Sequence, residues 1–146
     1  MNKTVLLSLL SLLFISQITA QKQDTIIQKK KYFTRHLQAA VTLDGIPNEA
    51  AWNDVDWGGD FIQSQPYEER LPSHPTQFKI LYDDRFLYIA YNCLDASPDS
   101  ISRRMGRRDE FPGDWIEVNI DSYHDLRTAF SFTLSVSGVR GDEFVS

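Results

Sequence analysis

Strict alternation of side-chain character over residues 114–121 (DWIEVNID) constrains the fold more than any other feature of this sequence. The aliphatic positions are Ile116, Val118 and Ile120, and the positions between them carry Trp115, Glu117, Asn119 and Asp121. A period of two predicts a β-strand with one buried side and one solvent-facing side. The outward side would present an indole ring, a carboxylate and an amide in a row. An apolar platform flanked by hydrogen-bonding groups is the chemistry that holds a sugar ring, so this side is a candidate binding surface.

Further alternating runs predict that most of the chain is β-structure. Residues 76–82 and 86–94 flank the polar turn at residues 83–85, which predicts a β-hairpin. In its first strand Phe78, Ile80 and Tyr82 share one face. Residues 129–136 predict another strand, with Phe130, Phe132, Leu134 and Val136 inward and Ser131, Thr133 and Ser135 outward. Residues 32–42 and 139–145 predict two more strands.

Short helical turns and loops complete the pattern. Residues 47–52 predict a helical turn with Asn48 as its cap and with Trp52 and Val55 buried. Residues 97–99 predict a second turn, and the prolines of residues 63–75 predict a loop. Strands at this spacing predict an all-β fold, an antiparallel, jelly-roll-like β-sandwich. The sequence stops at Ser146 within a predicted strand, so we expect a sandwich that is incomplete at its C-terminus.

The first 20 residues have the features of a secretory signal peptide, with a basic start and an apolar run from Val5 to Ile18. The alternative is a membrane anchor, but the run is shorter than the roughly 20 apolar residues of a spanning helix. We therefore predict a signal peptide (1–20), a polar linker or leading edge (21–35) and a β-domain (36–146). The mature chain would have no membrane span and would be secreted, periplasmic or attached to the cell surface.

Charge and cysteine content exclude several functions. The formal net charge is −5, which argues against nucleic acid and anionic membranes as partners. Cys93 is the single cysteine, so no internal disulfide forms, and its apolar strand predicts a buried, inert thiol. Glu117 with Asp114 or Glu110 is the one carboxylate pair that would suit a glycosidase. Without a predicted cleft, we expect no catalysis by this chain itself.

Three phrases together resemble a family 9 carbohydrate-binding module: residues 41–52 (VTLDGIPNEAAW), 78–90 (FKILYDDRFLYIA) and 114–121. The resemblance covers about residues 41–138 and extends to large secreted bacterial proteins in which a β-rich region follows this module. It implies a sandwich that binds xylan or glucan without cleaving it. It also implies that Glu117 contacts sugar, that Phe111 stands where the family has a clamping tryptophan, and that Thr133 replaces an arginine. On this basis Phe111 is a better aromatic partner for Glu117 than Trp115.

Two further ligand questions follow from the residues. Family members often hold structural calcium, for which Asp83, Asp84, Asp121 and Asp125 are weak candidates, and the three histidines show no metal-ligand spacing. The cluster Arg103, Arg104, Arg107 and Arg108 either binds an acidic sugar or pairs with neighbouring acids such as Asp109 and Glu110, and we favour the pairing.

The expected function is therefore binding of a poly- or oligosaccharide at Phe111, Trp115, Glu117, Asn119 and Thr133, in association with glycan breakdown. The alternative is an interaction or structural domain of a larger, outer-membrane-associated β-rich protein with no sugar ligand.

Overall fold

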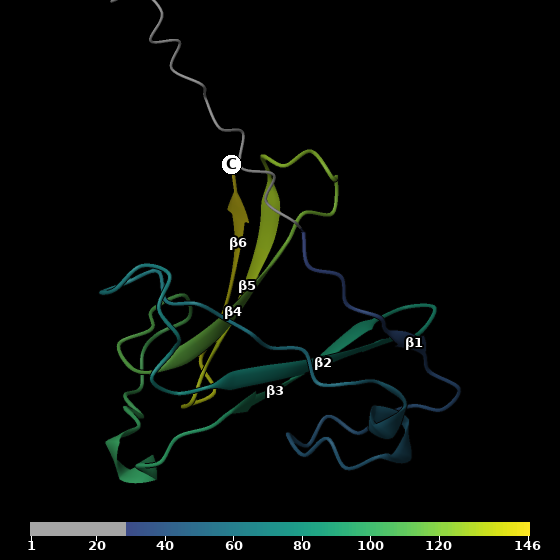
Figure 1. Ribbon diagram of the computed structural model, residues 1–146, viewed down its shortest axis with the longest axis horizontal. Helices are drawn as coiled ribbons and strands as arrows, with labels where there is room; N and C mark the ends of the chain where they lie inside the picture. The colour runs from purple at the N-terminus through teal and green to yellow at the C-terminus, as the bar shows by residue number, and fades with distance from the viewer. Residues whose placement is uncertain (1–28) are drawn as a thin grey trace, which may run out of the picture. The chain divides into compact units, whose positions relative to one another are not determined.

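The computed structural model describes residues 29–146 (Figure 1). The chain divides into two units, Met1–Tyr32 and Phe33–Ser146, and every strand and helix described here belongs to the second unit. The predicted signal peptide and most of the predicted linker lie outside the described residues. No helix within the described part of the chain is long and apolar enough to cross a membrane.

The first sheet has the strand order β1-β2-β3. Strand β2 (Thr76–Tyr82) pairs antiparallel with β3 (Leu87–Cys93), which confirms the predicted hairpin. Its turn is held by the Asp83 carboxylate, whose Oδ1 accepts the backbone N–H groups of Arg85 and Phe86 at 2.7 Å each. The first predicted strand is much shorter than expected, because only β1 (Arg35–His36) pairs, in parallel, with the end of β2.

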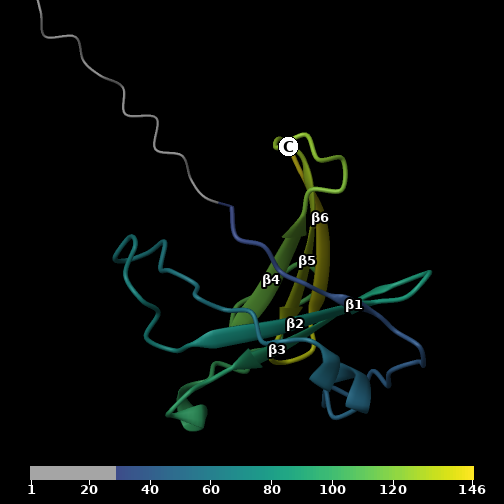
Figure 2. The same ribbon diagram turned by 45° about the vertical axis from the view of Figure 1, so that its right-hand side comes forward.

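The second sheet is fully antiparallel and has the order β4-β5-β6. Its strands are β4 (Trp115–Ile120), β5 (Ala129–Ser135) and β6 (Arg140–Val145), which confirms the three strands predicted here from the sequence. In both ribbon views β4, β5 and β6 run in a different direction from β2 and β3 (Figures 1 and 2). The β-rich class predicted from the sequence is thus confirmed.

Two 3-10 helices lie between the strands. Helix η2 (Ala50–Asp54) begins later than predicted, and its cap position is Glu49, not Asn48. The Glu49 carboxylate instead accepts the Thr42 backbone N–H at 2.6 Å and the Trp52 indole N–H at 3.1 Å. Helix η3 (Pro98–Ser100) confirms the second predicted turn.

The buried hydrophobic cluster consists of Leu37, Trp52, Val55 and Leu81, which confirms the predicted burial of Trp52 and Val55. It packs against one face of the β2–β3 hairpin, where Tyr88 and Ala90 of β3 contact it. This face carries Leu81 and Lys79, so β2 is buried in the opposite phase to Phe78, Ile80 and Tyr82. Residues of β4, β5 and β6 take no part in this cluster.

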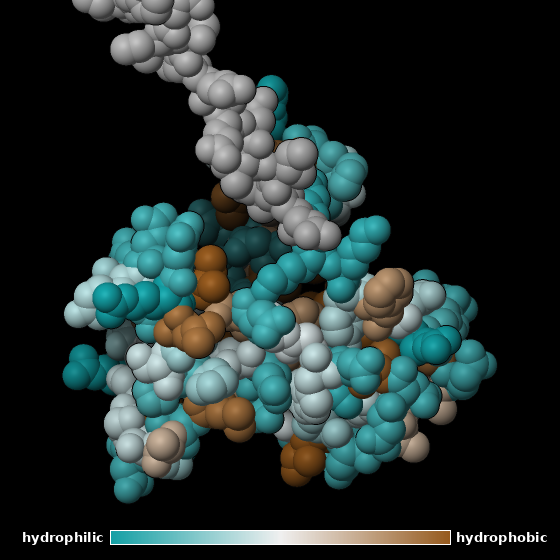
Figure 3. Space-filling view, viewed as in Figure 1, coloured by the Kyte–Doolittle hydropathy of each residue, from teal (hydrophilic) through white to brown (hydrophobic). Residues whose placement is uncertain are grey.

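Burial of β5 is the reverse of the prediction. Ser131, Thr133 and Ser135 are buried, whereas Phe132 and Leu134 are 49% and 46% exposed. The small side chains of the central strand β5 are buried between cross-strand partners that include Glu117, Asn119 and Glu143, although those partners are themselves exposed. Hydrophobic side chains remain at the surface among hydrophilic ones (Figure 3). The predicted burial of Cys93 is also wrong: the thiol lies at the last position of β3 and is exposed.

Candidate functional site

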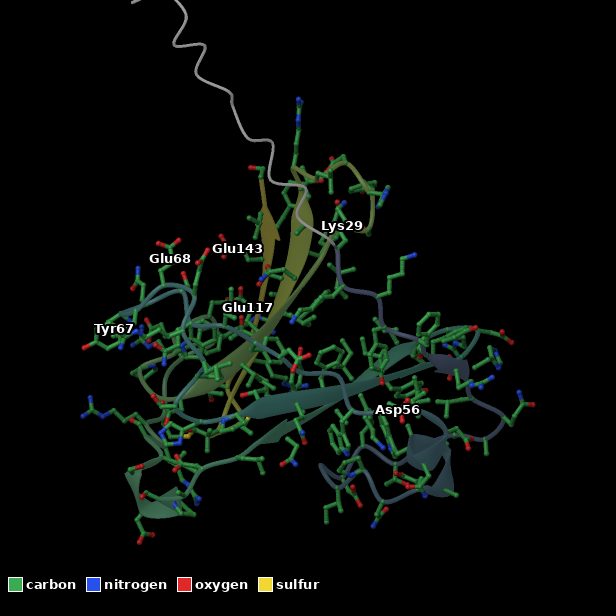
Figure 4. All side chains as sticks on the ribbon, viewed as in Figure 1. Lys29, Asp56, Tyr67, Glu68, Glu117 and Glu143 are labelled. Carbon is green, nitrogen blue, oxygen red and sulfur yellow. The ribbon has the colours of Figure 1, made fainter. Side chains whose placement is uncertain are left out.

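The polar face of the second sheet brings side chains from all three strands into rows. Glu117 lies opposite Thr133, which in turn lies opposite Gly141. In the next row are Asn119, Ser131 and Glu143. Side chains two apart on a strand share a face, so these rows are neighbours on one surface. Figure 4 shows Glu117 on this sheet with Glu143 farther along it.

Two hydrogen bonds orient the Glu117 carboxylate. The Asn119 side-chain amide donates to Oε1 at 2.8 Å, and the Thr133 hydroxyl donates to Oε2 at 3.1 Å. An ionised carboxylate has about four acceptor positions. Glu117 is exposed, so the remaining positions are open to solvent or to a ligand. The predicted trio of Glu117, Asn119 and Thr133 is therefore one connected unit.

An aromatic pair lies beside this unit. The ring centroids of Phe111 and Trp115 are 6.2 Å apart with an interplanar angle of 48°. Phe111 is half-buried because its ring packs onto Gly141: a Cβ there would lie 2.6 Å from the ring's Cζ. Trp115 is 49% exposed and is therefore the more open platform of the two. The structure places both rings at the site instead of favouring Phe111 over Trp115.

A closed loop carries Phe111 to this position. The Ser102 backbone N–H donates to Asp114 Oδ2 at 2.8 Å, and the Asp114 N–H donates to the Ser102 carbonyl at 3.0 Å. We call residues 102–114 the arginine loop. Its interior is tight, since a Cβ on Gly106 would lie 2.2 Å from the Glu110 carbonyl oxygen. These contacts give the loop a defined shape without regular secondary structure.

The arginine loop also covers the outer edge of β6. The Asp109 backbone N–H donates to the Arg140 carbonyl at 3.4 Å, and the Asp142 N–H donates to Asp109 Oδ1 at 3.3 Å. Arg108 forms ion pairs with Asp142 and Asp109. Arg103, Arg104 and Arg107 form none with any carboxylate among residues 29–146. The predicted internal pairing of the cluster is thus right for one arginine of the four.

A hollow of about 550 Å³ lies next to the opposite, apolar side of the sheet. Its apolar lining comes from both sheets, with Ile89 and Tyr91 of β3 on one side. The second sheet contributes Ile116, Val118, Phe132 and Leu134, and Arg108, Arg140 and Asp142 lie along one border. Glu117, Thr133 and Gly141 also border it, but their strand phase directs their side chains to the polar face.

The four calcium candidates are divided between two turns. The carboxylates of Asp83, Asp121 and Asp125 hold those turns through hydrogen bonds, whereas Asp84 pairs with His36. Asp83 accepts the Arg85 N–H and the Tyr88 hydroxyl, and these bonds lower the pKa of Asp83. Asp121 accepts the N–H groups of Asp125 and Leu126. The N–H groups of Thr128 and Arg127 lower the pKa of Asp125. Residues 29–146 contain no group of three or more such side chains placed to hold a metal ion.

The alternative carboxylate partners of Glu117 serve the arginine loop. Asp114 closes the neck of the loop, and Glu110 Oε2 accepts the Arg107 backbone N–H at 3.4 Å.

Two residues of the polar face, Gly141 and Glu143, were not predicted from the sequence. The sequence predicted a strand at residues 139–145, but the register between β5 and β6 was needed to bring these two residues to the polar face.

Comparison of the chain with family models, with curated protein sequences and with solved structures gives no match.

Proposed function

We propose that this chain is a non-catalytic module that binds a poly- or oligosaccharide, of the xylan or glucan class, on the polar face of β4, β5 and β6. The observation that carries the proposal is the oriented Glu117 carboxylate next to the exposed ring of Trp115. Sugar rings offer apolar C–H faces and hydroxyl donors, which an aromatic ring and a carboxylate bind together. The sequence phrases that resemble family 9 carbohydrate-binding modules support the same assignment.

The proposal includes an antiparallel β-sandwich and an exported protein. The shared lining of the 550 Å³ hollow supports the sandwich, because apolar side chains of both sheets border one space. The signal-peptide pattern of residues 1–20 supports export, to the periplasm, the cell surface or the medium. We place the module within a glycan-degrading system, and structural calcium remains part of the proposal through family resemblance alone.

Affinity gel electrophoresis of the full chain tests the proposal. Gels containing soluble xylan or β-glucan should retard the wild type, and Glu117→Gln should migrate as in a gel without polysaccharide. Glu68→Gln is the matched control, because Glu68 is an exposed glutamate of the 63–75 loop (Figure 4). Equal retardation of wild type and Glu117→Gln would reject Glu117 as the centre of the site.

The exposed apolar face of the second sheet favours a second candidate function, an interaction module. Phe130, Phe132, Leu134 and Phe144 are between 37% and 52% exposed, and they share this face. Contiguous exposed apolar surface marks sites of protein association. The partner would be a β-rich domain. Light scattering separates the candidates, since a monomer that binds glycan supports the first and self-association without glycan binding supports the second.

A further inference from the structure

The arginine loop reverses the charge balance of the rest of the chain. It has four arginines against three acidic residues, in a protein whose formal net charge is −5. The three acids are already engaged, since Asp114 and Glu110 accept loop N–H groups and Asp109 accepts the Asp142 N–H. Arg103, Arg104 and Arg107 are exposed, and no carboxylate of residues 29–146 neutralises them.

A separate hollow lies between this loop and the turn that joins β5 to β6. Its volume is about 310 Å³, which is at the lower end of the range of small-molecule sites, roughly 300–1,000 Å³. Arg108 and Arg140 both line it, together with Gly106, Ser137 and Gly138. The Ser137 hydroxyl donates to the Arg104 carbonyl at 2.9 Å, so loop and turn are fastened to each other. This border of the hollow is therefore held in place, and of its two arginines Arg108 is ion-paired with Asp109 and Asp142.

The arginine loop adjoins the polar face described above. Phe111 belongs to the arginine loop, and its ring contacts both Trp115 and Gly141. A polysaccharide chain stacked on Trp115 and continuing past Phe111 would run along the arginine loop, to which Phe111 belongs. Guanidinium groups bind carboxylates through two parallel hydrogen bonds, a planar geometry that neutral sugars do not use.

We propose that the arginine loop binds the carboxylates of uronic acid residues, so that the preferred ligand is an acidic polysaccharide. This inference rests on the proposed carbohydrate-binding function and assigns its ligand class. Trp115 and Glu117 hold a sugar ring, and Arg103, Arg104 and Arg107 bind carboxylates carried by the same chain. Arg108 has a different role, because its ion pairs with Asp109 and Asp142 hold the loop against β6.

The test compares gels of polygalacturonate, dextran sulfate and neutral xylan. One variant carries Arg103→Gln, Arg104→Gln and Arg107→Gln. The control carries Arg35→Gln, Arg85→Gln and Arg127→Gln, which removes the same charge from exposed positions elsewhere. We expect the loop variant to lose about tenfold or more in affinity for polygalacturonate. Its affinity for xylan should stay within about twofold, as should both affinities of the control. Circular dichroism confirms that both variants fold.

Replacing the same three loop arginines by lysine separates carboxylate recognition from net charge. The lysine variant should recover less than half of the lost affinity, because lysine keeps the charge but not the planar fork. Full recovery by lysine, or stronger binding of dextran sulfate than of polygalacturonate, would overturn the uronate assignment. Retention on xylan with no preference for polygalacturonate would overturn this inference alone. Retention on none of the three gels, together with no retardation in the β-glucan gel, would reject the carbohydrate-binding function itself.

Discussion

The hydroxyl of Thr133 donates a 3.1 Å hydrogen bond to Glu117 Oε2 from the neighbouring strand of the same sheet. A threonine hydroxyl supplies one neutral donor and no positive charge. The Glu117 carboxylate is therefore oriented but not neutralised, and its remaining acceptor positions suit sugar hydroxyls.

Replacing Thr133 should weaken glycan binding through the orientation of Glu117. Thr133→Val keeps the shape of the side chain and removes the donor, which is worth about 0.5–1.5 kcal/mol. We expect a two- to tenfold loss of affinity, roughly, by isothermal titration calorimetry with a soluble oligosaccharide. Thr133→Ser keeps the hydroxyl and is the matched control. Equal affinities of the valine and serine variants would contradict a role for this hydrogen bond.

Gly141 should tolerate no side chain while Phe111 is present. A Cβ at this position lies 2.6 Å from the Phe111 ring, closer than side-chain atoms approach in folded proteins. Overpacking of this kind costs about 1–3 kcal/mol, so Gly141→Ala should lower the midpoint of urea unfolding. Gly59→Ala is the control, since its nearest neighbour would be the Thr76 carbonyl oxygen at 3.5 Å.

A double variant locates the cause of that destabilisation. Phe111→Ala removes the ring, so Gly141→Ala in that background should cost much less than in the wild type. The difference between the two costs is the coupling energy of the pair. Identical costs in both backgrounds would show that the strain at Gly141 comes from elsewhere.

The sequence predicted the positions of the strands better than it predicted which of their faces are buried. Alternation located β2, β3, β4 and β5 among the six strands of the described residues, and it placed Glu117, Asn119 and Trp115 on one face. It did not predict which face is covered, because cover comes from segments distant in sequence. Thr133 is buried on the central strand between its cross-strand partners Glu117 and Gly141, and no local pattern contains that information.

The ends of the elements and the part of the site that lies on β6 could not be predicted without the pairing of the strands. Strand β1 has two residues because only Arg35 and His36 find partners on β2. Gly141 and Glu143 join the site through the register of β5 with β6, which the turn between them sets. The aromatic pair was predictable in composition but not in geometry. Phe111 packs on Gly141 only because the arginine loop returns to the sheet.

Acid should destabilise the β4–β5 turn through Asp125. Hydrogen bonds from Thr128 and Arg127 lower the pKa of Asp125 in the folded chain. The unfolded chain titrates near the usual value of about 3.9. The stabilising contribution is therefore complete above that value and is lost as the pH falls through the lower, folded pKa.

Urea unfolding at pH 7 and at pH 3 measures this effect. Asp125→Asn should reduce the free energy of unfolding at pH 7. It should also narrow the difference between the free energies of unfolding measured at the two pH values. Asp54→Asn, at an exposed aspartate of η2, should leave that difference unchanged. A pH dependence that is the same in Asp125→Asn and in the wild type would show that other carboxylates are responsible.

Lys79 should stabilise the hydrophobic cluster even though it carries a charge. The residue is 8% exposed, and its Nζ donates to the Trp52 carbonyl and lies 4.9 Å from the Trp57 ring centroid. Lys79→Met keeps the aliphatic stem but leaves that carbonyl without this donor and removes the cation–π contact. The two losses together predict a decrease of roughly 2–4 kcal/mol in the free energy of unfolding.

Thermal and urea unfolding check this value, with Lys31→Met as a control at an exposed lysine. Fluorescence adds a local signal, because Lys79 contacts both Trp52 and Trp57 and their emission should shift in the Lys79 variant alone. An opposing effect is that Lys79→Met removes a charge from a poorly solvated position, which would raise the stability of the variant. A Lys79→Met variant as stable as the wild type would mean that this release offsets both lost contacts, and the hydrogen bond to Trp52 would then contribute no net stability.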